Sequence, residues 1–155
     1  MNEIENVIKK NDSAVAKLPV LAAVVTLIGI ADAVYLTVKH YTGEKVPCSI
    51  VEGCEQVLTS SYAEIAGIPL AAFGALAYFT AFSLAILAAF GNRLMWQIFG
   101  VQVALMAIFT IWLVYLQAFV IEAFCQFCLV SAAVTLALLA IFLVSKFVRS
   151  KQLKP

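Results

Sequence analysis

The sequence predicts an all-α membrane protein, a four-transmembrane-helix bundle whose outer loop carries a short amphipathic helix. Of the 155 residues, 64% are hydrophobic and 12% are charged, whereas soluble domains carry about 25% charged residues. Four apolar runs reach the roughly 20 residues that a bilayer-spanning helix needs. These runs offer no charged face to water, which excludes the amphipathic helices of a soluble bundle.

The four predicted spans form one membrane domain, residues 18–145. They are Leu18–Val38, Ile65–Phe90, Leu94–Ile121 and Ala123–Val144. A polar N-terminal segment, residues 1–17, precedes the domain and is expected to be mobile; a basic tail, residues 146–155, follows it. The first run also has the basic start and the Ala31-Asp32-Ala33 match of a signal peptide. Because apolar residues resume up to Val38, we favour a full span.

The placement of lysine and arginine predicts the orientation of the bundle. With four spans, both termini share one side of the membrane, and that side holds most of the basic residues. It carries Lys9, Lys10, Lys17, Arg93, Lys146, Arg149, Lys151 and Lys154, against Lys39 and Lys45 on the other side. We therefore expect cytoplasmic termini in the cytoplasmic membrane and an outer loop at about residues 40–67. The net charge of +1 and the lack of a basic stripe give no indication of a nucleic-acid partner; membrane lipid is the expected surrounding.

The outer loop divides into two parts. Glycine and proline in Tyr41–Gly53 predict an irregular segment. Glu55–Ala66 has a helical pattern, in which the apolar residues Val57, Leu58, Tyr62 and Ile65 share one face. This pattern predicts a short amphipathic helix on the membrane surface or over the mouth of the bundle.

Four cysteines carry the functional argument. Cys125 and Cys128 head the fourth span, three residues apart and thus on one helix face. The helix dipole and unpaired N–H groups at a helix start stabilise a thiolate. Cys48 and Cys54 lie in the outer loop. All four are expected at the outer face, where disulfides persist.

Three interpretations of the cysteines are open. They could form permanent structural disulfides or be inert core residues. Four thiolates could bind zinc if the pairs converge, although the loop has C-x5-C rather than a second C-x2-C. Or they could exchange electrons, with a mobile outer pair, a rigid pair at a helix start and a lipid-soluble acceptor in the membrane. The third interpretation uses every feature; the first two describe a non-catalytic membrane subunit with structural disulfides or a Cys-ligated zinc site.

An ordered set of motifs runs through residues 18–144. It comprises Tyr35-Leu36-Thr37, Cys48 and Cys54, Ser60, Gly67-Ile68-Pro69-Leu70, Gly74, and Cys125 and Cys128. In this set the chain resembles the vitamin K epoxide reductase family in its bacterial or archaeal form. The DsbB-like oxidases do similar chemistry, but their C-x-x-C heads the second span rather than the fourth.

The resemblance implies a four-helix bundle around a quinone, capped by the loop. It implies an enzyme, a quinone-dependent disulfide oxidoreductase, that drives disulfide formation in exported proteins. In this interpretation a partner attacks Cys48, the released Cys54 attacks Cys125, and Cys128 faces the quinone. By family register Ser60 would bond the quinone oxygen or the Cys128 thiolate. The helix-face pattern puts Ser61 nearer the apolar side, but the C-x5-C-x5-S spacing is specific and we keep Ser60.

Two departures from the family pattern refine the expectation. Members that act on vitamin K in animals carry a tyrosine where this chain has Ala132, which favours a respiratory quinone of the menaquinone or ubiquinone type. Many bacterial members carry a fused thioredoxin-like domain, whereas this chain ends at Pro155. We therefore expect a separate thioredoxin-like partner on the extracytoplasmic side.

Several other polar residues have less specific expectations. Asp32 is an intramembrane carboxylate, either a proton-handling group or an interfacial group bonded to a neighbouring helix. His40 is expected to be an interfacial loop residue. Gln97, Gln102 and Gln117 are expected to bond between helices.

Overall fold

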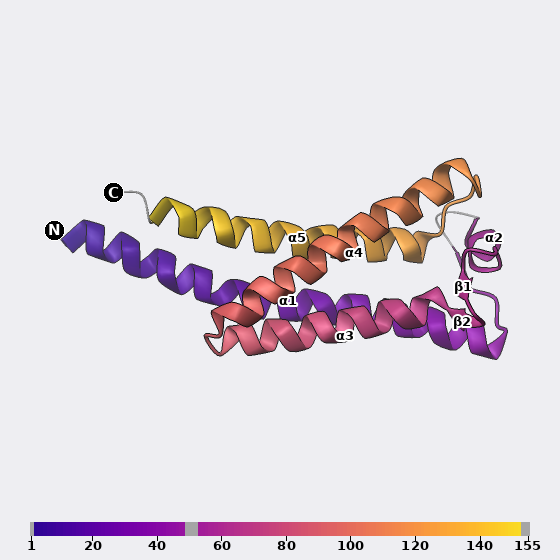
Figure 1. Ribbon diagram of the computed structural model, residues 1–155, viewed down its shortest axis with the longest axis horizontal. Helices are drawn as coiled ribbons and strands as arrows, with labels where there is room; N and C mark the ends of the chain where they lie inside the picture. The colour runs from indigo at the N-terminus through magenta and orange to yellow at the C-terminus, as the bar shows by residue number, and fades with distance from the viewer. Residues whose placement is uncertain (1, 49–52, 153–155) are drawn as a thin grey trace.

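The computed structural model describes the backbone of residues 2–48 and 53–152, and the side chains of residues 17–48 and 53–150. Its elements, in chain order, are α1 (Asn2–Thr42), α2 (Cys54–Leu58), β1 (Glu64–Ile65), β2 (Ile68–Pro69), α3 (Leu70–Ala89), α4 (Arg93–Phe119) and α5 (Gln126–Gln152) (Figure 1). The parts of the four long helices apolar enough to cross a membrane are Lys17–Thr42, Leu70–Ala89, Arg93–Phe119 and Gln126–Ser150. The prediction of an all-α, four-helix membrane protein is confirmed.

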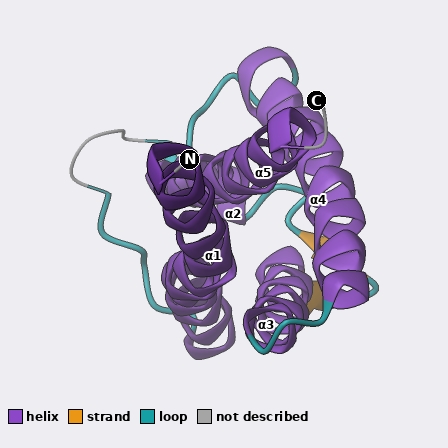
Figure 2. Cartoon of the chain, turned by 90° about the vertical axis from the view of Figure 1, so that its left-hand side faces the viewer, coloured by secondary structure: helices purple, strands orange, loops and turns teal. Residues whose placement is uncertain are grey.

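The four long helices surround a common interior. α1 packs against α3 and α5, and α4 packs against the same two helices from the other side (Figure 2). The start of α1 and the end of α5 lie at one end of the bundle, whereas α2 and the two strands lie at the other. The cysteines are therefore gathered at the end of the bundle away from both termini.

Small residues allow close helix packing in the core. Ala22, Ala81 and Ala85 are completely buried. A Cβ on Gly29 of α1 would lie 2.6 Å from the ring of Tyr78 on α3. Small side chains let membrane helices approach closely where the hydrophobic effect does not drive association; here Gly29 makes room for the large tyrosine.

The outer surface of the bundle is apolar. Leu76, Val101, Ile108 and Ile111 are each more than 60% exposed. Such an excess of exposed large apolar side chains is expected where the surrounding solvent is lipid.

The loop helix expected at Glu55–Ala66 is wrong beyond Leu58. α2 ends there, and β1 and β2 form an antiparallel hairpin in which Glu64 is opposite Pro69 and Ile65 is opposite Ile68. Its turn is Ala66-Gly67, with φ of 54° and 80°. Two positive φ values are what a tight type I′ hairpin turn requires, and a helix cannot accommodate them.

The hairpin also corrects two expectations about neighbouring residues. Tyr62 and Ile65, expected on the apolar face of one helix, lie beyond the end of α2, with Ile65 in β1. The second span begins at Leu70 rather than at Ile65, and the Leu70 N–H donates to the Ala63 carbonyl at 2.8 Å.

The first helix is longer than the predicted span. α1 begins at Asn2, so the polar segment expected to be mobile continues the helix toward the N-terminus. Of the irregular stretch Tyr41–Gly53, residues 49–52 lie outside the described residues.

Candidate functional site

Cys48 and Cys54 form a disulfide at the outer end of the bundle. Their Cα atoms are 6.2 Å apart. Cys54 is the first residue of α2 and is 1% exposed, whereas Cys48, in the loop before it, is only half-buried. A reagent from the aqueous side therefore reaches the Cys48 sulfur more readily than the Cys54 sulfur.

Gly53 brings the disulfide against the segment that precedes α5. A Cβ on Gly53 would lie 2.8 Å from both the backbone N and O of Phe124, and 2.9 Å from the Cβ of Ala123. Only a residue without a side chain permits this approach. Cys54, Val57, Ala123 and Cys125 consequently form one buried cluster.

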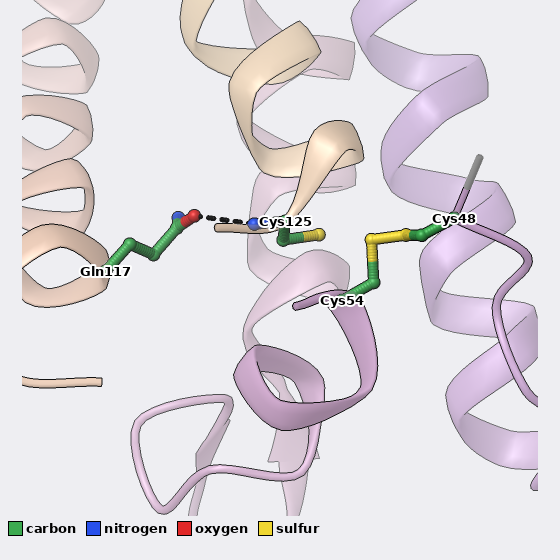
Figure 3. The surroundings of a disulfide bond; sticks show 4 residues. All are labelled: Cys48, Cys54, Gln117 and Cys125. Carbon is green, nitrogen blue, oxygen red and sulfur yellow. Dashed lines mark hydrogen bonds between the residues drawn. A yellow bond between two sulfur atoms is a disulfide. The ribbon is translucent and has the colours of Figure 1, made fainter. Parts of the chain in front are cut away.

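The second cysteine pair belongs to the same cluster. Cys48 and Cys128 pack against it, so all four cysteines converge. In Figure 3 the sulfur of Cys125 points toward the Cys48–Cys54 disulfide. Cys125 and Cys128 are both free thiols. The structure thus combines an oxidised loop pair with a reduced helix pair.

Cys125 caps the N-terminus of α5. Its carbonyl accepts the first helical bond, from the Leu129 N–H at 3.0 Å, as an N-cap residue does. Its sulfur accepts hydrogen bonds from the Cys128 thiol and from the backbone N–H groups of Cys128 and Phe127. The bond from the Cys128 thiol contributes most, and together these bonds lower the pKa of Cys125 from 9.0 to about 7 against the opposing effect of burial.

Two further contacts hold this turn in place. The ring of Tyr35 on α1 packs against Phe127, with ring centroids 5.2 Å apart. Gln117 of α4 is 3% exposed; its side-chain Oε1 accepts from the Cys125 N–H at 3.0 Å and its carbonyl from the Ala123 N–H at 3.1 Å (Figure 3). Gln117 therefore fixes the backbone that carries Cys125.

The sequence indicated only part of what the glutamines do. Gln102 of α4 donates to the Ala77 carbonyl on α3 at 2.8 Å, and Gln97 accepts from Lys146 of α5 at 3.0 Å; these interhelical bonds confirm the expectation. Gln117 was also expected to bond between helices, but it bonds to the backbone of Ala123 and Cys125 in the segment before α5, a role that the sequence analysis missed. The available signal was a glutamine at the end of an apolar span, eight residues before Cys125.

A cavity of about 700 Å³ lies inside the bundle next to the cysteines. Its walls are mainly apolar side chains of the four long helices, among them Leu36, Phe73, Leu105 and Met106. Of the four cysteines, all within the described chain, Cys128 alone lines it. Ligand sites are typically about 300–1,000 Å³ and mostly apolar with a few polar groups, so this cavity can hold a small apolar molecule against the Cys128 sulfur.

Charged residues surround the outer mouth of the cavity. Lys39 pairs with Glu44, and Lys45 with Glu55 at 3.5 Å. His40, at the end of α1, pairs with Glu64 of β1 at 3.2 Å. Ion pairs this exposed contribute little stability. His40, expected in the loop, belongs to α1 and lines the cavity; its interfacial position stays a prediction.

Ser60 and Asp32 also line the cavity. The Ser60 hydroxyl donates to the Val57 carbonyl at 2.7 Å, whereas Ser61 is exposed and is not part of the lining. One carboxylate oxygen of Asp32, Oδ2, is buried without a hydrogen-bond partner. Among the described residues, no group of three or more His, Cys, Asp or Glu side chains is arranged to hold a metal ion.

A family model described as the vitamin K epoxide reductase family matches residues 20–143, most of the chain. The chain belongs to the vitamin K epoxide reductase family. The resemblance inferred from the motifs is thereby confirmed, and the matched region contains both cysteine pairs. Vitamin K epoxide reductase family members are membrane oxidoreductases of disulfide-related chemistry and are generally associated with quinones. The roles of the individual cysteines and of Ser60 stay predictions.

Proposed function

We propose that this protein is a membrane thiol–quinone oxidoreductase. It reoxidises a thioredoxin-like partner, passes the electrons to a quinone and so drives disulfide formation in exported proteins. One observation carries the proposal: of two thiols one helical turn apart, Cys125 lies toward the loop disulfide and Cys128 lines the cavity. This pair can receive electrons from one side and deliver them to the other.

Electrons would enter through Cys48. A thiolate of the partner attacks the more accessible sulfur of the Cys48–Cys54 disulfide, forming a mixed disulfide with Cys48 and releasing Cys54. The second thiol of the partner then displaces Cys48, and the partner leaves oxidised. The burial of Cys54 keeps it from the partner and holds it beside Cys125.

Transfer between the pairs would pass through a Cys54–Cys125 bond. When the helix pair is oxidised, Cys54 attacks Cys125 and Cys128 leaves as a thiolate. Cys48 then attacks Cys54, which restores the Cys48–Cys54 disulfide and releases Cys125. The resulting state has an oxidised loop pair and a reduced helix pair; the Cys48–Cys54 disulfide and the free thiols of Cys125 and Cys128 support this order.

The quinone would occupy the cavity as the oxidising substrate. Closure of the Cys125–Cys128 disulfide releases two electrons and two protons, and the quinone takes up both to become a quinol. The apolar walls suit a prenylated ring, and Ala132 gives a small apolar surface in the lining. The Ser60 hydroxyl, which donates to the Val57 carbonyl, would turn to a quinone oxygen when the quinone binds. Ala132, where the members that act on vitamin K in animals carry a tyrosine, favours a respiratory quinone of the menaquinone or ubiquinone type over vitamin K epoxide.

The orientation follows from the same chemistry. The cysteine end of the bundle would face the extracytoplasmic side, where exported proteins acquire disulfides. Arg93 at the start of α4 and Lys146 near the end of α5 belong to the opposite end, as cytoplasmic basic residues should.

Turnover by the purified protein tests the proposal. The protein in detergent is mixed with a reduced thioredoxin-like protein and a soluble quinone, and quinone absorbance is followed for wild type and Cys128→Ser. We expect turnover by wild type and its loss in the variant. No turnover by wild type with several quinones and partners, together with stoichiometric zinc in the protein, would instead support a structural or metal-binding subunit.

A further inference from the structure

A cluster of hydroxyl groups lies at the inner part of the cavity. Tyr78 of α3 is 2% exposed. Its hydroxyl oxygen lies 2.8 Å from the Ser131 carbonyl oxygen, the Ser131 Oγ and the Thr135 Oγ1 of α5. Since a phenol has one proton, it donates to one of these groups and accepts from another. The cluster therefore forms a connected network of proton donors.

The hydroxyl network lies on the same face of α5 as Cys128, deeper in the membrane span. Ser131 is three residues beyond Cys128 and Thr135 four beyond Ser131, so all three lie along one face of α5. Together with Tyr78 they line the same cavity. A molecule in contact with the Cys128 sulfur thus lies between the outer mouth and this network.

Asp32 faces the cavity from α1. It lines the same cavity as Cys128 and the Tyr78 network, and its charge acts on Cys125, Cys128 and Tyr78. It precedes the mouth residue Lys39 by seven positions, or about 10 Å along the helix axis. The other carboxylates that line the cavity, Glu44, Glu55 and Glu64, belong to the outer loop and hairpin and are ion-paired.

The buried oxygen of Asp32 differs from the other buried polar groups of the bundle. Thr26 donates to the Ala23 carbonyl at 2.6 Å, and Trp96 donates to Ser145 at 2.8 Å. Among the described side chains, Oδ2 of Asp32 is the buried polar atom without a partner. An unpaired carboxylate in a membrane interior is costly, and a purely structural role would leave that cost unexplained.

We propose that Asp32 is the proton-transfer residue of quinone reduction, and that the Tyr78–Ser131–Thr135 network orients the substrate beside it. The inference rests on the proposed function. As the Cys125–Cys128 bond forms, the Cys128 S–H bond breaks and the Asp32 carboxylate takes the proton. Two electrons pass to the quinone, and Asp32 returns the proton to a quinone oxygen. Asp32 ends unprotonated. The Cys125 proton leaves to water at the outer mouth, and the second quinone oxygen takes a proton from that water, so that the two electrons of the dithiol and two protons in all reach the quinol.

Separating the two half-reactions tests the role of Asp32. The first is reduction of the oxidised protein by the partner. It is measured by quenching the reaction and counting the free thiols by mass spectrometry. The second is a single turnover of the reduced protein with a soluble quinone, measured as the change in quinone absorbance. General acid–base groups typically contribute about 10²–10⁴-fold, so we expect Asp32→Asn to slow the second half-reaction roughly 100-fold and to leave the first unchanged.

Two variants complete the design. Asp32→Glu keeps the carboxylate and is expected to reduce quinone within about tenfold of wild type. Gln97→Leu removes the hydrogen bond that Lys146 of α5 donates to Gln97 of α4, two residues outside the cavity lining, and is expected to affect neither half-reaction. Asp32→Ser is the second uncharged variant, for use if Asp32→Asn does not insert and fold.

The outcomes separate the two proposals. A wild-type protein that accepts electrons from the partner but never reduces quinone would overturn the proposed function itself. With wild-type quinone reduction in place, the role of Asp32 falls if an uncharged variant reduces quinone at the wild-type rate. It also falls if both half-reactions slow together, or if Asp32→Glu is as slow as Asp32→Asn, because those results indicate a structural residue.

Discussion

Replacing Gly53 with alanine should slow electron transfer between the two cysteine pairs. The added Cβ would lie 2.8 Å from the backbone N and O of Phe124, whereas ordinary contact begins at 3.4 Å. To remove this clash, Gly53 and Phe124 must therefore separate by about 0.6 Å. Because the contact is with backbone atoms, no side-chain rotation provides this separation. The start of α2, and Cys54 with it, must move away from the segment that carries Cys125.

The displacement sets the expected size of the effect. A misplacement of about 1 Å at a reacting centre can cost roughly 100-fold in rate, so 0.6 Å of separation should cost about tenfold. The rate is measured by mixing the oxidised protein with reduced partner, quenching with acid and a maleimide, and locating the free thiols by mass spectrometry. Reduction of the loop pair should stay fast, while reduction of Cys125 and Cys128 should lag.

Gly91→Ala is the matched control. Gly91 has φ of +93° in the turn between α3 and α4, at the end of the bundle away from the cysteines, and a Cβ there meets nothing within 4 Å. Strain at this position should lower stability by about 1 kcal/mol without changing the transfer rate. Wild-type transfer in Gly53→Ala, or an equal loss in Gly91→Ala, would refute the argument from close approach.

Three further predictions concern the environment of the site. The first uses a background in which serine replaces both loop cysteines, and thiolate absorbance measures the pKa of Cys125. Cys128→Ala should raise this pKa from about 7 toward 9.0, so that the thiolate disappears at neutral pH, whereas Cys128→Ser keeps a hydrogen-bond donor and should keep the lower pKa. Equal titration curves for the two variants would contradict the role of the Cys128 hydrogen bond. Ser60→Ala should raise the quinone KM about fivefold, the value of one hydrogen bond near 1 kcal/mol, while Ser61→Ala leaves it unchanged; equal KM values in steady-state kinetics would remove Ser60 from the site. Gln117→Leu leaves the buried Cys125 N–H without its acceptor and should lower the free energy of unfolding by about 1–3 kcal/mol, whereas an unchanged thermal unfolding midpoint would show that the bond is dispensable.

The spans were predictable because bilayer thickness imposes their length. The third predicted span, Leu94–Ile121, differs from α4, Arg93–Phe119, by at most two residues at either end. At its start the Asn92 side chain accepts from the Leu94 and Met95 N–H groups, a local signal that sequence patterns contain. The motif order likewise predicted the family, which the match over residues 20–143 confirms.

The outer loop was less predictable because the spacing of its apolar residues fits a helix, whereas the chain turns into a hairpin at Ala66-Gly67. The spacing of Val57, Leu58, Tyr62 and Ile65 matches a helix face, but it does not exclude a one-turn helix followed by a hairpin. The positive φ values at Ala66-Gly67 decide between them, and alanine gives no warning of such a conformation.

The geometry of the site depends on contacts between distant parts of the chain. The approach of Gly53 to Phe124 joins segments about 70 residues apart, and no local pattern reveals it. Asp32 was conspicuous as a charge within a span, whereas Tyr78, Ser131 and Thr135 were not. A hydroxyl in an apolar run usually bonds to its own helix, as Thr26 does, so the interhelical cluster could not be distinguished from the sequence.

Cross-linking between the two cysteine pairs tests the central claim most directly. The double variant Cys48→Ser/Cys128→Ser retains Cys54 and Cys125, and Cys54→Ser/Cys128→Ser retains Cys48 and Cys125. Each is exposed to a mild thiol oxidant, and its free thiols are counted by mass. If electrons pass from Cys54 to Cys125, the first variant should form an internal disulfide rapidly and the second slowly. Equal rates, or faster closure in the second variant, would contradict this path.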